Sequence, residues 1–434
     1  MASVRRVRRL IPWLAMVVAP SYSQHSFDAN TLLAVARRRI EQGVERQHQF
    51  TCDAMVSREF YRADISESHE GISDTTNGQA RLLVWRDRLH VEVAVFDGQQ
   101  LFSWPGTGAF HFEGLDDMTG GGASGTGDFG PFAASFLADS DPASVRFRGV
   151  GEWTGKQLAE YSYDVPLVSS HYAIQTGVRR FERTAYQGSM FVDTGTGDLR
   201  RLVIRVPRPP AGSGVLRAEV DTHYEPQRST GGPELFPSMS TLAMTLDGGN
   251  EAVNRMTYRG CRVFTSESTL SFGISPSAPP KAEERTTPTR APPGLPVRST
   301  MVTPIDSRTT SAGDLFEARV VEPVKQGKRT LIPKGAVLHG RVVQVEQQFY
   351  PRVAVRVSLR FDSVEFDGTS LSIALVARAT ALTSSDSESW HRTPSRPQVL
   401  RVVEDPGRRV AAIWVVGKDH IRLDTHTVNS WETR

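Results

Sequence analysis

Residues 89–96 read Leu89-His90-Val91-Glu92-Val93-Ala94-Val95-Phe96, and Asp97-Gly98 follows them. Apolar and other side chains alternate along this stretch, which is typical of a strand with one buried side and one solvent-facing side. Asp-Gly favours a tight turn between two antiparallel strands. The stretch therefore predicts a β-hairpin whose second strand contains Leu101, Phe102 and Trp104.

The same alternation recurs along most of the chain. It is found in Leu202–Val206, in Ala218–Tyr224 and in Val353–Phe361, where Asp367-Gly368 supplies the next turn signal. Such patterns indicate antiparallel sheets with one buried face. Helical spacing is found at Leu33, Ala36, Ile40 and Val44, with Asp28 or Asn30 as cap, and a short helix is expected at Gly130–Ala138. The fold class predicted is mainly β.

A proline-rich segment divides the chain. Residues 274–297 hold seven of the 26 prolines, and such a segment is semi-extended and lacks a core. We expect two antiparallel β domains joined by a mobile linker, residues 28–273 and residues 298–434. A mobile Ser-, Arg- and Pro-rich loop is predicted at 382–409, followed by a final hairpin of Ile413–Val416 and Ile421–Val428.

The N-terminus predicts export. Four arginines (Arg5, Arg6, Arg8, Arg9) precede the apolar run Leu10–Ala19, and small residues follow at Ser21 and Ser23. This is the pattern of a cleaved signal peptide, residues 1–23. The run is shorter than the roughly 20 residues that span a bilayer, so a transmembrane anchor is the weaker interpretation. The expected localisation is periplasmic or extracellular.

Charge argues against nucleic-acid binding. The 434 residues contain 51 Lys and Arg against 48 Asp and Glu, a net charge of +3. Residues 1–23 hold four arginines and no acidic residue, so the expected mature chain has 47 basic and 48 acidic residues. A near-neutral chain gives no electrostatic case for binding nucleic acid or an anionic membrane surface.

Two cysteines, Cys52 and Cys261, bracket the first predicted domain. In an oxidising compartment an even number favours pairing, so a Cys52–Cys261 disulfide is predicted, with two separate buried thiols as the alternative. Neither cysteine has a neighbouring Cys or His at metal-binding spacing.

No segment carries a specific catalytic, cofactor or metal motif. The glycine-rich run 120–127 is followed by Asp128-Phe129 rather than Lys-Ser/Thr, so a loop before a short helix is favoured over a phosphate site. Asp193–Asp198 lacks the calcium-loop pattern and predicts a turn between Met190–Val192 and Leu199–Val206. His420, Asp424 and His426 would share one face of a strand, but exposed polar residues explain them equally well. We predict no catalytic residue, cofactor or metal.

The first domain resembles the LolA/RseB-like group of bacterial envelope proteins, which fold as an open β-barrel closed by helices. The resemblance rests on the N-terminal helix, on Leu82-Leu83-Val84-Trp85-Arg86-Asp87-Arg88-Leu89 and on the strand–turn–strand segment Phe191–Leu202. Phe50-Thr51-Cys52 and Tyr258–Phe264 are similar to the edges of an uncharacterised family of exported bacterial proteins.

The second domain resembles the β-barrel of TrbI-like secretion-channel subunits, over about 80 residues. The similar stretches are Gly313–Ala318 and Leu331–Gly340, in which Pro333-Lys334-Gly335 is a turn and Gly340 permits a bend or bulge. A smaller β-barrel or sandwich is expected here, without a channel role.

These observations favour a non-enzymatic exported envelope protein that binds an apolar ligand such as a lipid, or an envelope protein partner, through the concave face of its first domain. An open barrel has to fill its interior with side chains, a helix or a guest. The alternatives are a two-module scaffold protein without a small ligand, and a hydrolase with a site near the glycine-rich run.

Overall fold

The computed structural model describes most of the two predicted β regions. The described residues are 28–46, 49–63, 73–76, 79–96, 99–107, 110, 115, 118, 132–177, 180–229, 232–263, 290–377, 398–399, 411–426 and 428–434. The predicted signal peptide, the Asp97-Gly98 turn, the glycine-rich run 120–127 and residues 274–289 lie outside them. None of the helices in the described part of the chain is long and apolar enough to span a membrane.

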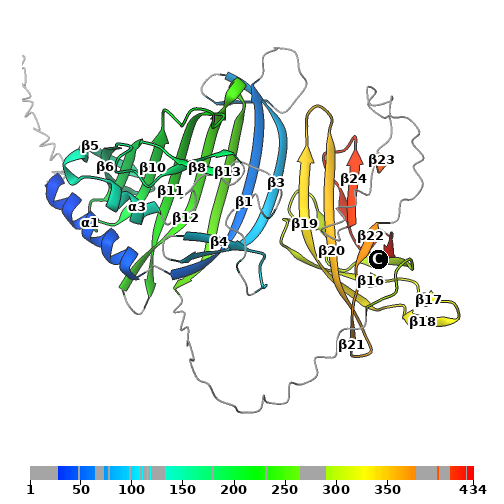
Figure 1. Ribbon diagram of the computed structural model, residues 1–434. Coiled ribbons are helices and arrows are strands. Elements are labelled where there is room, and N and C mark those ends of the chain that lie inside the picture. Colours follow the sequence, from blue (N-terminus) through cyan, green and yellow to red (C-terminus); the bar gives the residue numbers. More distant parts are fainter. Residues whose placement is uncertain are drawn as a thin grey trace, which may run out of the picture.

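The described residues of the N-terminal part, between 29 and 263, form a curved antiparallel sheet, a separate two-stranded sheet and helices (Figure 1). Its helices are α1 (Ala29–Arg46) and α3 (Phe132–Asp139). Its strands are β1 (Gln49–Ala63), β2 (Ser73–Thr76), β3 (Gln79–Phe96), β4 (Gln99–Ser103), β5 (Arg146–Trp153), β6 (Lys156–Val165), β7 (Ala173–Gly177), β8 (Arg180–Arg183), β9 (Tyr186–Asp193), β10 (Leu199–Val206), β11 (Val215–Ser229), β12 (Gly232–Leu246) and β13 (Glu251–Val263). The pairing order is β5–β6–β9–β10–β11–β12–β13–β1–β3, and β7 pairs only with β8 among the described strands.

Helix α1 forms where the apolar spacing predicts it. Asp28 caps it, because its carboxylate accepts the backbone N–H of Thr31 at 2.9 Å. Leu32, Ala36 and Ile40 are buried against the sheet, with Leu33 packed at the edge of this contact. Helix α3 contacts α1 and buries Phe136 in the same cluster. Both helices therefore cover one face of the N-terminal sheet.

The disulfide between Cys52 and Cys261 joins β1 to β13, with Cα atoms 4.1 Å apart. Thr51 pairs with Arg262 and Asp53 with Arg259, so Cys52 lies opposite two residues of β13. This extra residue is a β-bulge, and Gly260 within it has a φ of 58°, which favours glycine.

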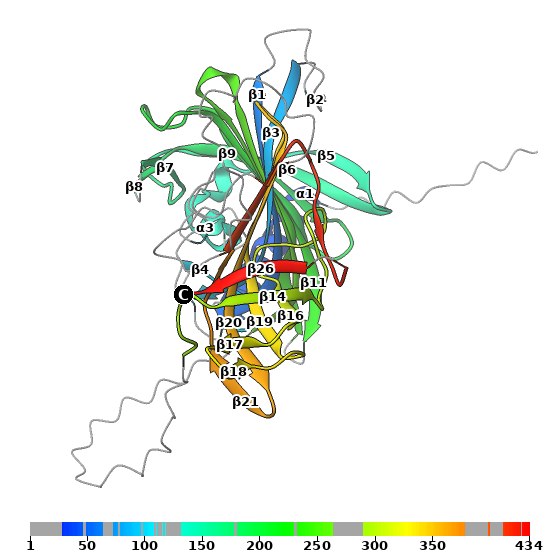
Figure 2. The same ribbon diagram turned by 90° about the vertical axis from the view of Figure 1, so that its right-hand side faces the viewer.

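The C-terminal part, residues 290–434, is a second antiparallel sheet that curls on itself (Figure 2). Its strands are β14 (Pro296–Met301), β15 (Ile305–Asp306), β16 (Leu315–Val320), β17 (Val324–Gln326), β18 (Arg329–Ile332), β19 (Val337–Gln348), β20 (Ala354–Phe366), β21 (Thr369–Ser372), β22 (Leu375–Ala377), β23 (Gln398–Val399), β24 (Ala411–Val416), β25 (Arg422–Leu423) and β26 (Val428–Thr433). The order β24–β20–β19–β16–β14–β26–β22 brings β22 back beside β24.

The core of the C-terminal part is built round three aromatic rings. Phe361 lies 5.1 Å, between ring centroids, from both Phe316 and Trp431. Gly340 lies directly beneath Phe316, where a Cβ atom would come within 2.6 Å of the ring and 2.3 Å of the Arg360 carbonyl oxygen. The register of β19 against β20 shifts at this glycine, as the sequence predicts.

Two expectations for the C-terminal part are corrected. The predicted final hairpin does not form: β24 pairs with β20 and β23, Arg422–Leu423 pairs with β15, and β26 pairs with β14 and β22. Residues 290–297, expected in the linker, pack on the C-terminal part, since Ala291 is buried and the Gly294 N–H donates to the Thr433 carbonyl at 2.7 Å. Of the predicted loop 382–409 the structure describes only residues 398–399, the short strand β23, and the mobile loop stays a prediction.

The two parts meet edge to edge, which the sequence did not predict. Glu346, Gln347 and Gln348 of β19 pair with Asp87, Arg86 and Trp85 of β3. Beside them, the His90 N–H donates to the Ala312 carbonyl at 2.6 Å, and the Ala312 N–H to the Arg88 carbonyl at 2.9 Å. Strands β2 and β4 cover the ends of the same β3 edge. The edge is thus covered by both parts of the chain, which protects it from pairing with other molecules.

Candidate ligand site on the concave face

Alternate residues of the N-terminal sheet form a continuous apolar face. Ala159, Tyr161 and Tyr163 of β6 face the same cluster as Leu202 and Ile204 of β10. Because successive side chains of a strand point to opposite sides, these residues share the face on which α1 and α3 lie. The cluster also contains Met190, Val192, Ala218, Val220, Tyr224, Leu242 and Met244.

A second apolar cluster lies on the same face toward β3, beyond the buried polar residues Thr222, Ser240 and Asn254. It is built from β1, β3 and β13, and its members include Val56, Val91 and Met256. Phe102, Trp104, Leu115 and Met118 of the segment after β3 also pack in it. The predicted glycine-rich loop, which separates Met118 from α3, lies outside the described residues. The apolar surface of the N-terminal sheet is therefore covered by α1 and α3, by the two-stranded β7–β8 sheet, whose Ile174 packs in the first cluster, and by residues after β3 such as Trp104 and Leu115.

Buried tyrosines supply most of the polar atoms in the first cluster. The Tyr161 hydroxyl donates to the Ala29 carbonyl of α1 at 2.7 Å, and the Tyr163 hydroxyl to the Val203 carbonyl at 2.7 Å. Burial raises the pKa of Tyr161 to about 12 and that of Tyr163 well above its ordinary range. These phenols are neutral at physiological pH, so they act as hydrogen-bonding groups rather than as bases.

Helix α3 is held by a buried carboxylate. Asp139 accepts the backbone N–H of His171 at 2.9 Å, the Tyr186 hydroxyl at 2.8 Å and the His171 Nδ1. Within the described residues, the His171 ring has no other hydrogen-bond partner, so no nucleophile joins the Asp139–His171 pair. Arg37 of α1 donates to Ser140 Oγ at 3.1 Å and connects the two helices at this end.

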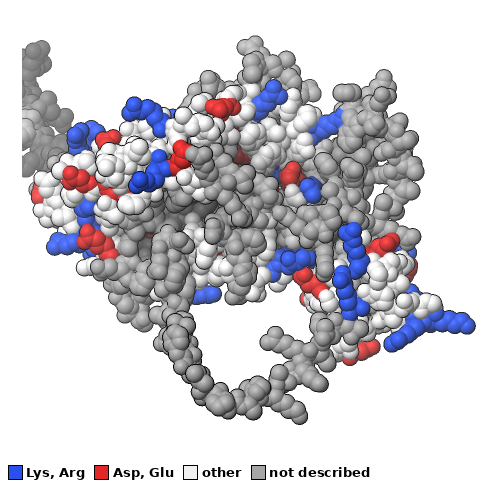
Figure 3. All heavy atoms as spheres, in the orientation of Figure 1, with Lys and Arg blue, Asp and Glu red and all other residues white. Residues whose placement is uncertain are grey.

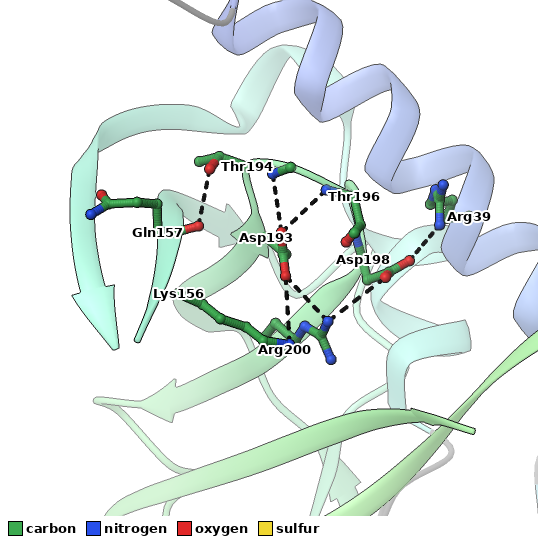
Figure 4. Close-up of polar contacts among 9 residues, drawn as sticks. Arg39, Lys156, Gln157, Asp193, Thr194, Thr196, Asp198 and Arg200 are labelled. Atoms are coloured by element: carbon green, nitrogen blue, oxygen red, sulfur yellow. Dashed lines mark hydrogen bonds and ion pairs between the residues drawn. The ribbon is translucent and has the colours of Figure 1, made fainter. Parts of the chain in front are cut away.

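The Asp193–Asp198 segment forms the predicted turn and ties α1 to the sheet (Figure 4). Asp193 Oδ1 accepts the backbone N–H groups of Gly195 and Thr196 at 3.0 and 3.1 Å. Arg200 donates to the other oxygen of Asp193 at 3.2 Å. Arg39 of α1 donates to Asp198 at 2.6 Å. The Asp193 and Asp198 carboxylates thus accept hydrogen bonds from other residues of the protein. We call Arg39, Asp193, Asp198 and Arg200 the α1 clasp.

Hydrogen bonding decides the charge state of Asp193. Burial raises the pKa of its carboxyl group, but the N–H groups of Thr196 and Gly195 and the Arg200 guanidinium outweigh burial and hold the pKa below its ordinary value of 3.8. The carboxylate therefore stays charged at neutral pH. Its role in this arrangement is to hold the turn under α1.

The other residues considered in the sequence do not assemble into a site. His420 Nε2 lies 2.9 Å from Asp306 Oδ1, whereas Asp424 accepts the backbone N–H of His426. Among the described residues, no group of three or more His, Cys, Asp or Glu side chains has the arrangement of a metal site. Acidic and basic side chains are interspersed over the face seen in Figure 3.

A shallow depression of about 560 Å³ lies on the C-terminal part. His339, between Glu317 at 3.6 Å and Glu365 at 3.4 Å, forms part of its wall. Its lining is largely polar, so it does not suit an apolar ligand.

No protein-family model and no curated protein matches the chain. Among solved structures, it is similar to a LolA superfamily protein from Nitrosomonas europaea, with 11% identity and a TM-score of 0.25, over 56% of this chain and 96% of that one. A putative outer membrane lipoprotein-sorting protein domain from Vibrio parahaemolyticus has 9% identity and a TM-score of 0.27, over 56% and 95%. A DUF1329 family protein from Desulfovibrio piger has 12% identity and a TM-score of 0.25, over 55% and 94%.

Two of these proteins carry names from the group that the first predicted domain resembles. TM-scores this low transfer neither a ligand nor a function to this chain. The resemblance of residues 298–434 to TrbI-like barrels stays a prediction.

Proposed function

We propose that this protein is a non-enzymatic, exported envelope protein that holds an apolar ligand between the concave face of its N-terminal sheet and helix α3. The observation that carries the proposal is the apolar face of this sheet, two clusters of buried side chains that α1, α3, the two-stranded β7–β8 sheet and residues after β3 cover. A protein partner with an apolar segment would use the same face.

Helix α3 is the cover that we propose moves when a ligand binds. Among its described side chains, Phe136 is the one large apolar group that is fully buried, and re-exposing such a side chain costs about 3 kcal/mol. Each methylene that a ligand buries contributes about 0.8 kcal/mol. An acyl chain that buries about four methylenes offsets the exposure of Phe136, and further methylenes have to offset any loss of the hydrogen bonds to Asp139. Helix α1 is less easily moved, because the α1 clasp holds it to the sheet as well.

Two other functions have weaker support. A scaffold without a small ligand is favoured by the edge-to-edge contact between the two parts and by the exposed Phe147 and Trp153 on β5. A hydrolase has only the Asp139–His171 pair to support it, and a broad screen for hydrolytic activity tests that alternative.

Binding of a fluorescent fatty-acid analogue to delipidated protein tests the proposal. We expect saturable binding to the wild-type chain. Phe136→Ala should bind the analogue more tightly, because the vacated volume admits the chain, although the variant loses about 3–4 kcal/mol of stability. Phe181→Ala, at a side chain that is 46% exposed on β8, is the matched control and should bind like the wild type. Absence of saturable binding by all three proteins would contradict the proposal.

A further inference from the structure

The contact between the two parts contains a row of charged residues that crosses four strands. Arg58 of β1 pairs with Asp87 of β3, Asp87 with Glu346 of β19, and Glu346 with Arg356 of β20. Directly paired residues of neighbouring strands lie on the same face, with Cβ atoms about 5 Å apart. The boundary between the two parts runs between Asp87 and Glu346, so two carboxyl groups face each other across it.

The two carboxyl groups are not equivalent. Asp87 is buried, and both of its carboxylate oxygens accept hydrogen bonds from Arg58: Oδ1 from Nε at 2.8 Å, and Oδ2 from Nη2. Glu346 accepts a hydrogen bond from Gln344 Nε2 of its own strand at 3.0 Å. Like charges directly opposite each other destabilise strand pairing. The contact is therefore more stable when Glu346 carries a proton than when it is ionised.

A second titratable contact lies a few residues along β3. His90 Nδ1 is 2.9 Å from Asp314 Oδ1 of the C-terminal part. Asp53 of β1 and Arg341 of β19 also act on this ring. The same junction leaves no room for a larger residue at Gly313, where a Cβ atom would lie 2.0 Å from the His90 carbonyl oxygen. A charged His90 attracts Asp314 more strongly than the neutral ring, which keeps only a hydrogen bond without the charge.

We propose that the β3–β19 contact is a pH-sensitive latch: protons on Glu346 and on His90 both hold the two parts together, and the contact opens as the pH rises. The two groups act in the same direction by different means. The proton on Glu346 removes a charge that repels Asp87, and the proton on His90 adds a charge that attracts Asp314.

The pKa directions agree with this geometry. Burial raises the pKa of Glu346 above its ordinary value of 4.5, and Asp87 raises it further, against the opposing effects of Arg356, Gln344 and Arg58. The hydrogen bond with Asp314 raises the pKa of His90 above 6.5, burial lowers it, Asp314 and Asp53 raise it by their charge, and Arg341 lowers it. A group whose pKa is raised in the closed state stabilises that state fully below its ordinary pKa and loses the effect as the pH rises through the raised value.

Amide hydrogen exchange of the full chain tests the latch. The reporters are the backbone N–H groups that cross the junction, those of His90, Ala312 and Phe349, compared with amides of β12 and β13. Rates at each pH are divided by the intrinsic exchange rate. We expect the protection of the reporters to fall about tenfold or more between pH 5 and pH 8.5, since one pKa unit corresponds to a tenfold change in the equilibrium. The protection of β12 and β13 should stay constant.

Substitutions distinguish the contribution of Glu346 to the pH dependence from that of His90. Glu346→Gln, which mimics the protonated acid, should raise reporter protection at pH 8.5 and weaken its pH dependence. His90→Gln should lower protection at pH 5. Glu365→Gln, at an exposed side chain of β20, should behave like the wild type, and Gly313→Ala should show the exchange of the open state at every pH. Reporter protection that is constant from pH 5 to 8.5 in the wild type, or that falls equally in Glu346→Gln, would overturn the proposal.

Discussion

Cys52 and Cys261, separated by 209 positions in sequence, lie with Cα atoms 4.1 Å apart on neighbouring strands of the N-terminal sheet. The bond closes a loop that contains strands β3 to β12, which carry most of the apolar face proposed to bind a ligand. In the chain-entropy account, closing a loop of this length stabilises the folded state by about 5 kcal/mol.

Reduction should therefore lower the unfolding temperature of the N-terminal part much more than that of the C-terminal part, as followed by calorimetry with and without reductant. Cys52→Ser/Cys261→Ser should behave like the reduced protein. Labelling of both thiols in the unfolded, unreduced chain would show that the bond does not form.

The α1 clasp should depend on pH through Asp193. The pKa of Asp193 is lowered in the folded state. Its carboxylate therefore stabilises the folded state fully above the ordinary pKa of 3.8, and this stabilisation is lost as the pH falls through the lower folded pKa. Asp193→Ala removes acceptors for the Gly195 and Thr196 N–H groups, and we expect a loss of about 2 kcal/mol at pH 7 and less at pH 3.

Urea unfolding at the two pH values measures this difference. Asp164→Asn, at an exposed position of β6, is the control and should change stability by less than about 0.5 kcal/mol. Equal effects of the two substitutions at pH 7 would show that the clasp does not contribute.

Limited proteolysis should cut first within residues 274–289, the part of the predicted Pro-rich linker that precedes the C-terminal part. Because β3 and β19 pair directly, we expect the two fragments to elute together in gel filtration at pH 5. In Gly313→Ala the Cβ atom collides with the His90 carbonyl, so its fragments should elute separately. Separate elution of the wild-type fragments at pH 5 would contradict a stable junction.

Export predicts removal of residues 1–23. N-terminal sequencing of protein recovered from the periplasm or medium should begin at Gln24. A product that begins at Met1 would contradict cleavage by a signal peptidase.

Local patterns in the sequence predicted much of the N-terminal part. Alternation along residues 89–96, helical spacing from Asp28 onward and the Asp193–Asp198 turn each depend on neighbouring residues, and all three appear in the structure. The Cys52–Cys261 disulfide was predicted from the even number of cysteines and from the oxidising compartment that export implies. The strand, the helix and the turn can be predicted because short-range geometry decides them.

The junction could not be predicted in this way. Trp85-Arg86-Asp87 and Glu346-Gln347-Gln348 look like solvent-facing strand residues, and only the fold brings them into register. The final hairpin failed for a related reason: Gly417-Lys418-Asp419 does turn the chain, but Arg422–Leu423 then pairs with β15 instead of returning along β24. Pairing between distant segments is not encoded in a local pattern.

The central claim is that the concave face of the N-terminal sheet holds an apolar ligand. Native mass spectrometry of the full mature protein, purified from its own compartment without detergent, tests it most directly. The account predicts a mass above that of the polypeptide, with the excess released by organic solvent and identified as a lipid or similar apolar molecule. A polypeptide mass alone, both as purified and after incubation with a lipid extract of that compartment, would contradict the account.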